Sequence, residues 1–491
     1  MRLSELLENE EKGKVAIAAE DFEVTGLTAD SRRVAEGYLF AAIPGTQQDG
    51  RAFIAEAVAK GAVAILAPTG TRMGAYGRPV LLICDEEPRR RLARMAAAFY
   101  KRQPSHIAAV TGTNGKTSVA TFTRQIWTAL GHKAASLGTL GLEPARANAP
   151  AALTTPDPVD LMRCLAELAS DGIDRLAMEA SSHGLDQFRL DGVRVTSAAF
   201  TNLSRDHLDY HGDMERYLAA KQRLFAQLLP STGNAILNAD IPEFAALEAG
   251  CRARHQRIIS YGKAGADLKL LSLMPGPGRL DIEIEVFGKH HAVALPLAGT
   301  FQAWNALAAL GLVLAEGTDI EPAVEALFGL SGVPGRVDLV GETETGAHVY
   351  VDYAHTPDAL ETVLHALRPH TRGKLAVLFG CGGDRDPGKR PMMGGIASRL
   401  ADTVFITDDN PRSEDPADIR QQILTAVPEA FEFDDRGEAI ASAIASLGPG
   451  DTLVIAGKGH ETGQTVGDRV IPFDDRVVAR ASLFGPDGGR P

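Results

Sequence analysis

The chain has 491 residues, of which 45% are hydrophobic and 23% are charged, a composition typical of a globular protein with sizeable cores. At about 150 residues per domain, this length predicts three domains. Its 50 Lys and Arg residues against 63 Asp and Glu residues give a net charge of −13, which argues against nonspecific binding to nucleic acid or to an anionic membrane. Local basic side chains and backbone amides must then hold any anionic substrate.

The sequence also predicts the cellular location of the protein. Residues 1–8 alternate charged and apolar side chains and lack the continuous apolar stretch of a signal peptide. The longest apolar run, residues 306–315, is shorter than the ~20 residues that a membrane span needs. The four cysteines form no CxxC pair, so we expect reduced thiols and neither a disulfide frame nor a zinc site. We therefore expect a cytoplasmic protein, a monomer, with no nucleic-acid and no membrane partner.

The first hundred residues mix short strand and helix patterns. Residues 37–45 form an apolar run bounded by turn formers, which predicts a strand. Residues 52–67 predict a helix followed by a strand near 62–66. The polar stretch 101–105 contains a proline, and we place a domain boundary there, so that the first domain covers residues 1–102.

A phosphate-binding loop is predicted at residues 111–118, which read TGTNGKTS. The apolar strand pattern of residues 107–110 precedes it, and a helical pattern that ends near Leu130 follows. Glycines let backbone N–H groups surround a polyphosphate, and the helix N-terminus adds its positive dipole end. The strand, loop and helix therefore match the context in which such loops hold nucleotides.

Individual side chains of this loop have expected roles. Lys116 is predicted to reach the β- and γ-phosphates, and Thr117 or Ser118 to offer a hydroxyl to Mg²⁺. Val110 stands where the standard pattern has glycine, so Gly112 must form the opening turn. The alternative is a glycine-rich turn with a surface lysine.

Two further stretches carry groups suited to a metal ion. Residues 176–184 form a predicted strand that ends at the carboxylate of Glu179, and residues 201–209 follow a second strand and include the imidazole of His207. Alone, either stretch could be a capped turn or a polar helix start. Together with a phosphate loop, they favour a Mg²⁺-nucleotide centre.

Residues 214–229 predict a helix, closed by a proline, whose apolar stripe includes Lys221. Burial favours the neutral form of an amine. A neutral lysine can add CO₂ and become a carbamate, which binds metal as a carboxylate does. The alternative, favoured by periodicity alone, is a lysine whose stem covers the stripe and whose head reaches water.

The rest of the chain predicts more sheet. Residues 271–297 alternate polar and apolar side chains, as half-buried antiparallel strands do, and residues 332–336 form a turn-rich joint. Four later apolar strands, 349–351, 375–379, 404–407 and 453–455, each lead into a polar loop, with helical patterns between them. This alternation predicts a parallel sheet with ligands beyond the carboxyl ends of its strands.

Ordered motifs along nearly the whole chain are similar to those of the Mur ligases, the ATP-dependent amino-acid-adding enzymes of peptidoglycan synthesis. They are DSR at 30–32, the phosphate loop, EASSHG at 179–184, NLSRDH at 202–207, AK at 220–221, GR at 335–336 and DYAH at 352–355. The loops GGDRD at 382–386 and DNPR at 409–412 resemble the branch that adds meso-diaminopimelate.

The resemblance implies a three-domain α/β fold. It places a UDP-binding domain at residues 1–102, a central P-loop-type ATP-binding ligase domain at 103–336 and a Rossmann-like amino-acid-binding domain at 337–491.

The resemblance also implies a set of site residues. ATP would be bound by Gly112, Thr113, Asn114, Gly115, Lys116, Thr117, Ser118, Asn305, Arg336 and Asp352. Mg²⁺ would be bound by Thr117, Glu179, His207 and Lys221, the last as the N6-carboxylysine formed with CO₂, and the catalytic set would be Lys116, Lys221, Glu179 and His207. The UDP-muramyl-dipeptide would be bound by Ser31, Thr46, Gln47, Gln48, Thr154, Thr155, Ser181, Gln187 and Arg189. Diaminopimelate would be bound by Arg385, Asp409, Asn410, Pro411, Arg412, Gly457 and Glu461. Leu153 departs from the asparagine that some members carry.

The expected reaction passes the γ-phosphoryl of ATP to a carboxylate, and an amine then attacks the acyl phosphate. An arginine fork such as that of Arg412 matches the distal carboxylate of meso-diaminopimelate, which lysine lacks. The alternatives are a lysine-adding sister ligase, a folylpolyglutamate synthetase and a nucleotide-binding regulator.

Overall fold

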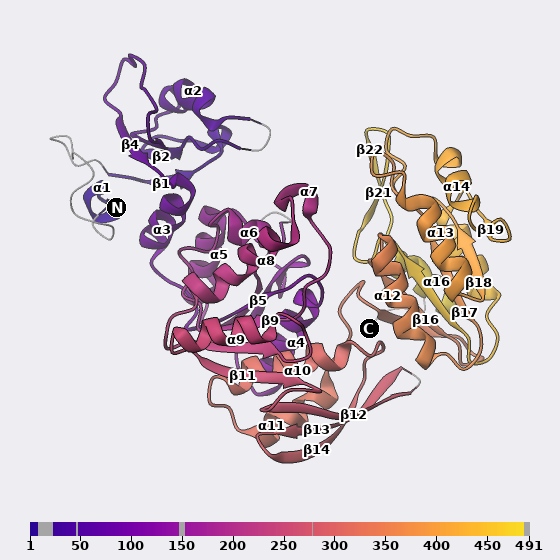
Figure 1. Cartoon of the computed structure of the whole chain (residues 1–491). Coiled ribbons are helices and arrows are strands. Elements are labelled where there is room, and N and C mark those ends of the chain that lie inside the picture. The colour runs from indigo at the N-terminus through magenta and orange to yellow at the C-terminus, as the bar shows by residue number, and fades with distance from the viewer. Residues whose placement is uncertain (8–22, 46–47, 147–152, 277, 486–491) are drawn as a thin grey trace. The chain divides into compact units, whose positions relative to one another are not determined.

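The computed structural model describes residues 1–7, 23–45, 48–146, 153–276 and 278–485 (Figure 1). The chain divides into two compact units, the first made of Met1–Ser260 and Gly311–Gly317 and the second of Tyr261–Leu310 and Thr318–Pro491. Both contain sheets with helices packed on them, which confirms the predicted α/β class. Among the helices of the described ranges, none combines the length and apolar character needed to cross a bilayer.

The first unit begins with a parallel sheet in the order β1-β2-β3-β4. Its elements are α1 (Leu3–Leu7), β1 (Gly26–Thr28), β2 (Tyr38–Ala41), α2 (Ile54–Ala59), β3 (Ala64–Pro68), β4 (Leu81–Asp85) and α3 (Pro88–Tyr100). The strand predicted at 37–45 and the helix and strand predicted within 52–67 are confirmed as β2, α2 and β3. The next strand starts at His106, so the polar stretch 101–105 connects α3 to that strand, and the domain boundary expected there stays a prediction.

The same unit also holds six strands of a ten-stranded sheet, in the order β10-β9-β5-β8-β6-β7. These strands are β5 (His106–Thr111), β6 (Ala134–Gly138), β7 (Gly141–Glu143), β8 (Arg175–Glu179), β9 (Ser197–Phe200) and β10 (Asn234–Asn238). The helices are α4 (Lys116–Ala129), α5 (Pro158–Ser170), α6 (Ser182–Asp186), α7 (Leu208–His211), α8 (Met214–Arg223) and α9 (Phe244–Ala253).

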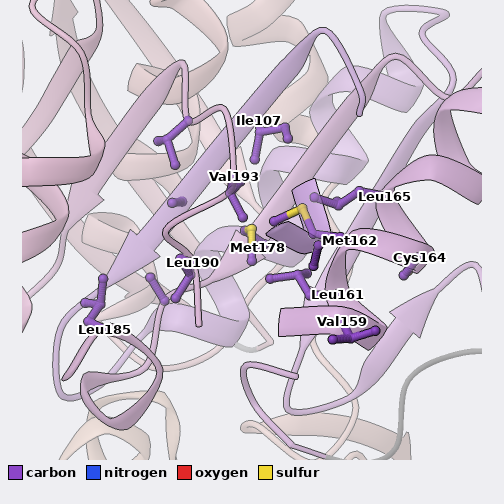
Figure 2. Close-up of a cluster of buried hydrophobic side chains, with 14 of the residues drawn as sticks. Ile107, Val159, Leu161, Met162, Cys164, Leu165, Met178, Leu185, Leu190 and Val193 are labelled. Carbon is purple, nitrogen blue, oxygen red and sulfur yellow. The ribbon is translucent and has the colours of Figure 1, made fainter. Parts of the chain in front are cut away.

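An apolar core fixes the central strands of this sheet. Figure 2 shows part of it, in which Ile107 of β5 and Met178 of β8 lie in one cluster with Leu161, Met162 and Leu165 of α5. Each fully buried side chain of this size contributes about 1.5–3 kcal/mol. The core therefore holds β5 and β8 rigidly and presents their carboxyl ends as fixed points.

The helix predicted over residues 214–229 changes character before its end. It is α-helical only to Arg223, and residues Leu224–Leu228 form a π-helical turn. π-helical turns carry no clear sequence signature and occur often at functional sites. The apolar stripe is otherwise as predicted, with Tyr217 and Leu224 fully buried.

The second unit contains the predicted antiparallel strands. β12 (Leu268–Gly276), β13 (Arg279–Val286) and β14 (Lys289–Leu295) form an antiparallel meander, and β11 (Arg257–Gly262), which begins in the first unit, pairs with β12 in parallel. The alternation seen in the sequence puts Leu280, Ile282 and Ile284 on the buried face. Two helices follow, α10 (Gln302–Leu314), whose residues from Gly311 on are counted in the first unit, and α11 (Ile320–Glu325).

A six-stranded sheet forms the rest of the second unit, in the order β15-β16-β20-β17-β18-β19. Its strands are β15 (Asp338–Glu342), β16 (His348–Asp352), β17 (Leu375–Phe379), β18 (Thr403–Ile406), β19 (Phe431–Glu432) and β20 (Thr452–Ala456). The helices α12 (Pro357–Leu367), α13 (Lys389–Leu400), α14 (Pro416–Leu424), α15 (Arg436–Ala445) and α16 (Asp475–Phe484) and the hairpin β21 (Gly463–Val466) and β22 (Arg469–Pro472) complete it. The four predicted strands are confirmed as the parallel set β16, β20, β17 and β18, with their polar loops at one edge.

Candidate active site

Three strands of the first unit end beside one another, and each carries a predicted site segment. β5 pairs with β8 on one side and β9 on the other. β5 leads into the phosphate loop, β8 ends at Glu179, and β9 is followed by Thr201. Because the connections diverge on either side of β5, this edge is the point where open α/β sheets bind ligands.

Two glycines shape the phosphate loop. Gly112 has a φ of +142°, and a Cβ at this position would collide with Thr201 Oγ1. Gly115 has a φ of +85° at the N-cap of α4. The opening turn therefore falls at Gly112, as expected from the valine at position 110. Lys116 Nζ donates to the carbonyl oxygens of Gly112 (3.0 Å) and Thr113 (2.7 Å), so the amine folds back over the loop.

The segment after β9 braces this loop, which the sequence analysis did not foresee. Asn202 accepts from the backbone N–H of Thr113 through its carbonyl (2.9 Å) and from that of Asn114 through Oδ1 (2.9 Å). Thr201 Oγ1 donates to the carbonyl of Asn114 (2.6 Å). The loop conformation is therefore set before a nucleotide binds.

Lys221 lies under the same loop. Its side chain is 1% exposed, and Nζ donates to the carbonyl of Gly112 (2.7 Å) and lies 4.3 Å from the centre of the Tyr217 ring. Burial, reinforced by the positive charge of Lys116, lowers the pKa of Lys221 to about 6. The alternative of a lysine head reaching water is wrong, because the head is enclosed.

Glu179 and His207 stand at the ends of the neighbouring strands. Glu179 is buried, and its two carboxylate oxygens accept from the N–H (2.8 Å) and the hydroxyl (3.2 Å) of Thr139. His207 is about half exposed and has a φ of +53°; its ring packs against His183 with centroids 4.9 Å apart. Glu179 is thus fixed by hydrogen bonds to Thr139, whereas His207 contacts the His183 ring and has its Nε2 3.4 Å from Asp206 Oδ2.

The predicted donor set suits Mg²⁺, which prefers oxygen ligands. Within the described ranges, no three His, Cys, Asp or Glu side chains are grouped to hold a metal ion. The predicted set requires only Glu179 and His207 of these types, with the hydroxyl of Thr117 and a carbamate on Lys221. Thr117 is buried in the first turn of α4. Three of the four predicted donors are oxygens, which Mg²⁺ prefers, and the assignment of the site stays a prediction.

A cavity of about 680 Å³ lies in the first unit, lined by loops of the N-terminal sheet and by residues around α5 and α6. Four predicted substrate residues line it: Ser31, Gln48, Gln187 and Arg189. Thr46 and Gln47 lie outside the described residues. The sequence analysis missed Arg33, whose guanidinium makes two 2.9 Å hydrogen bonds to Asp160 at the cavity wall. The contact between Arg33 and Asp160 joins residues 127 positions apart in the sequence, so no local sequence pattern indicates it.

Three other predicted substrate residues lie beside Glu179. Thr155 Oγ1 donates to the carbonyl of Glu179 (3.0 Å) and accepts from Ser181 Oγ (3.0 Å). Thr154 Oγ1 is 3.1 Å from Thr139 Oγ1. Together they form a row of hydroxyls between Glu179 and the start of α6.

The remaining predicted ATP residues belong to the second unit. Asp352 ends β16 and accepts from the N–H groups of Val337 (2.7 Å) and Ala354 (2.8 Å). Burial raises the pKa of Asp352, against the opposing effect of Arg336. The guanidinium of Arg336 lies 4.8 Å from the centre of the Tyr353 ring.

Asn305 lies in the first turn of α10. It is buried, and its Nδ2 donates to Gln302 Oε1 (2.8 Å).

The predicted amino-acid residues lie in loops at the carboxyl ends of β17, β18 and β20. Arg412 is half-buried with a φ of +52°, and its Nη1 donates to the carbonyl of Gly383 (2.8 Å). Arg385 is exposed. Gly457 has a φ of +113°, and a Cβ there would lie 2.6 Å from Asp409 Oδ2. The three loops therefore meet closely, as predicted.

The last of these predicted residues are Asn410, Pro411 and Glu461. Asn410 and Pro411 are buried, and Asn410 Nδ2 donates to Glu461 Oε2 (3.0 Å).

A buried ion pair lies beneath these loops. Arg436, the first residue of α15, donates from Nε and Nη2 to the two carboxylate oxygens of Asp475, each at 2.7 Å, and both side chains are fully buried. Arg436 also donates to the carbonyls of Ala456 (3.0 Å) and Asp408 (3.3 Å). One guanidinium thus ties the ends of β18 and β20 to the start of α16.

Family models match the chain in three places. Residues 23–100 match "Mur ligase family, catalytic domain", residues 110–313 match "Mur ligase middle domain", and residues 335–459 match "Mur ligase, glutamate ligase domain". The chain belongs to the Mur ligase family and has its three-domain fold.

Particular relatives are closely similar. The chain is 53% identical to the UDP-N-acetylmuramoyl-L-alanyl-D-glutamate–2,6-diaminopimelate ligase of Caulobacter vibrioides, over 96% of this chain and 97% of that protein. It is 52% identical to the protein of the same name from Brucella melitensis, over 95% of each. A solved structure with that name superposes with a TM-score of 0.72 at 33% identity and covers 98% of both chains.

Proposed function

We propose that the protein is an ATP-dependent ligase that joins meso-diaminopimelate to UDP-N-acetylmuramoyl-L-alanyl-D-glutamate in peptidoglycan synthesis. The observation that carries this proposal is the 53% identity, over 96% of the chain, to a relative of that name. The arginine-lined cavity, the phosphate loop and the loops around Arg412 support it independently. In this assignment, residues 1–102 bind UDP, residues 103–336 bind ATP and residues 337–491 bind the amino acid.

The reaction has two steps. An oxygen of the γ-carboxylate of D-glutamate attacks the γ-phosphorus of ATP, the bond to ADP breaks, and an acyl phosphate forms. The amine of the incoming amino acid then attacks the acyl carbon, and the tetrahedral intermediate expels phosphate, which carries the former carboxylate oxygen. The amine loses one proton in forming the amide.

The phosphate loop supplies positive potential for the first step, in which two anions must meet. In this proposal, Lys116 and the N-terminal amides of α4 stabilise the negative charge that redistributes on the γ-phosphoryl group. Mg²⁺, when bound by Thr117, Glu179, His207 and carbamylated Lys221, would neutralise phosphate charge. The hydrogen bonds from the phosphate loop to Asn202 hold the loop in one conformation before the reaction starts.

The carbamate on Lys221 is supported by geometry and by charge. The amine is enclosed, lies next to the loop carbonyl of Gly112 and has a pKa low enough to be largely neutral at pH 7. The positive charge of Lys116 disfavours a second ammonium at Lys221, which keeps the Lys221 amine in the neutral form that adds CO₂. The carbamate formed on Lys221 would be an anion near the ammonium of Lys116, so the two charges would attract.

The arrangement of polar groups in the first unit suggests how the long substrate lies. The cavity holds Arg33, Arg89 and Arg189 in its lining, which suits a diphosphate. The hydroxyls of Thr154, Thr155 and Ser181 suit the muramyl-dipeptide portion, whose terminal carboxylate must come near Glu179. In the second unit, Arg336 Nε is buried and has no hydrogen-bond partner among the described residues, so it can donate to a nucleotide oxygen.

One assay tests the proposed function. ADP release is measured with ATP, Mg²⁺ and the UDP-muramyl-dipeptide, in the presence of meso-diaminopimelate, L-lysine or L-glutamate, and a parallel arm replaces the UDP-muramyl-dipeptide with a folate. We expect release only with meso-diaminopimelate. Efficient turnover of L-lysine would identify the lysine-adding sister ligase, a requirement for folate and glutamate would identify a folylpolyglutamate synthetase, and no amino-acid dependence would indicate a regulator.

An isotope experiment tests the chemical route. With oxygen-18 in the γ-carboxylate of D-glutamate, the label should appear in the released phosphate. Unlabelled phosphate would rule out the acyl phosphate.

The setting of the protein is part of the same proposal. Its substrates are small molecules, and we place the enzyme in the cytoplasm as a monomer without nucleic-acid or membrane partners. Gel filtration with light scattering checks the oligomeric state.

A further inference from the structure

Lys458 is a buried lysine in the candidate amino-acid site to which the reaction described above gives no role. It follows β20 by two residues and is 0% exposed. Its Nζ donates to Asn410 Oδ1 (3.0 Å) and to the carbonyl of Gly463 (2.8 Å) and lies 3.4 Å from Glu461 Oε2. An ammonium has three N–H donors, and these three oxygens satisfy all of them. The Lys458 ammonium therefore has no N–H left to donate to a ligand.

The contacts of Lys458 decide which way the Asn410 amide faces. Asn410 Oδ1 accepts from both Lys458 Nζ and the N–H of Thr465 (2.8 Å), which occupies both lone pairs of that oxygen. Asn410 Nδ2 uses one N–H to bond Glu461 Oε2 (3.0 Å). The second N–H of Asn410 Nδ2 is left for a ligand, and this group can only donate. Asn410 therefore matches a carboxylate of the bound amino acid and not its ammonium group.

The same contacts fix the Glu461 carboxylate. Its Oε2 accepts from Asn410 and faces Lys458, and the side chain is about one-third exposed. This leaves Oε1 to meet a cation. A donor on Asn410 and an acceptor on Glu461, side by side, form a complement to one carboxylate and one ammonium on the same carbon, which is the distal end of a diamino diacid.

We propose that Lys458 is a positioning residue for amino-acid selection: it orients Asn410 as a donor to the distal carboxylate and Glu461 as an acceptor from the distal ammonium. The inference rests on the proposed function. It extends that function from Arg412, a direct contact, to a lysine that cannot touch the ligand. Lys458 acts through two neighbours, so its loss should weaken recognition of the amino acid and leave the nucleotide site intact.

A purely structural role must be separated from this one, because the bond to Gly463 also ties Lys458 to the hairpin β21–β22. The test uses the full chain, with the UDP-muramyl-dipeptide and a non-hydrolysable ATP analogue present, and calorimetry gives the Kd of meso-diaminopimelate and of L-lysine. We expect Lys458→Met to raise the Kd of meso-diaminopimelate at least tenfold and the Kd of L-lysine far less. The Kd of the ATP analogue should change less than twofold. Lys374→Met, at an exposed lysine directly before β17, is the control and should change none of these.

A Kd for meso-diaminopimelate that stays within twofold, or Kd values for both amino acids and the nucleotide that rise together, would overturn the proposal. Should Lys458→Met fail to fold, Asn410→Asp provides an independent test, because the near-isosteric change keeps an oxygen beside Lys458. It replaces the Nδ2 donor with an oxygen facing Glu461, so the Kd of meso-diaminopimelate should again rise at least tenfold. An equal or lower Kd would mean that Asn410 accepts from the ligand, contrary to the proposal. Failure of the proposed function is seen separately, as wild-type ADP release without dependence on meso-diaminopimelate.

Discussion

Replacing Lys221 tests whether a buried amine works as a carboxylate. Lys221→Ala should lose nearly all activity and regain part of it with acetate or propionate, because a small carboxylate can fill the space that the carbamate leaves. Lys221→Arg should not be rescued, since a permanent cation stays in place. The activity is ADP release in the complete reaction, with each carboxylic acid titrated at constant ionic strength.

The size of the expected CO₂ effect follows from the burial of Lys221. Only the neutral amine adds CO₂, and the pKa of Lys221 is lowered to about 6. At pH 7 about 90% of the side chain is then neutral, against about 0.04% for an ordinary lysine, a gain of roughly 2000-fold in the reactive form. As the pH falls through about 6 the amine becomes protonated, so the carbamate and the activity that depends on it should be lost on the acid side.

A readout besides turnover keeps this prediction sharp. Carbon-13 bicarbonate should give a carbamate resonance in the wild-type protein that is absent from Lys221→Ala. Full activity in CO₂-depleted buffer at pH 7, together with the absence of that resonance, would refute the reasoning.

Three further substitutions have definite expected outcomes. Lys116→Ala should lower kcat about a hundredfold or more, because its charge follows the γ-phosphoryl group; a change limited to the KM for ATP would contradict a catalytic role. Arg412→Ala should cost about 1.5–3 kcal/mol in kcat/KM for meso-diaminopimelate and much less for L-lysine, less than full burial would give because Arg412 is only half-buried; equal losses for both amino acids would contradict selection by this residue. Gly112→Ala should raise the KM for ATP and lower the Tm, since its φ of +142° and the nearby Thr201 Oγ1 leave no room for a Cβ, whereas wild-type kinetics and Tm would show that the loop adapts.

Much of the fold could be predicted because its strands are apolar runs bounded by turn formers. β5, β17 and β20 have five or six residues each, almost all buried, and the sequence shows them as plainly as the structure does. The hairpin β21–β22 was missed even though Gly467 and Asp468 between two strand-like runs are a recognised hairpin signal. Its side chains are mostly exposed, so hydrophobic periodicity did not mark it.

The residues of the candidate site also differ in how far local sequence patterns indicate them. Lys116 and Glu179 lie where their short motifs predict, in the phosphate loop at the start of α4 and at the end of β8, and their roles stay predictions. Asn202, Lys458 and Arg436 could not be predicted from local motifs, because each acts through a hydrogen bond to a residue far along the chain; 48 positions separate Lys458 from Asn410. Tertiary pairing of this kind leaves no local pattern. Burial of Lys221 is an intermediate case, since periodicity put it on the apolar face but did not decide whether the head was enclosed.

The ion pair between Arg436 and Asp475 makes α16 necessary for the arrangement of the candidate amino-acid site. α16 lies at the end of the sequence, where shortened or tagged versions of proteins are usually made, yet its first residue neutralises the cation that fastens the ends of β18 and β20. A chain that stopped before Asp475 would leave a guanidinium uncompensated inside the protein, a cost of about 3–5 kcal/mol. Removal of α16 should therefore alter the kinetics with the amino-acid substrate, although the helix supplies none of the predicted ligand contacts.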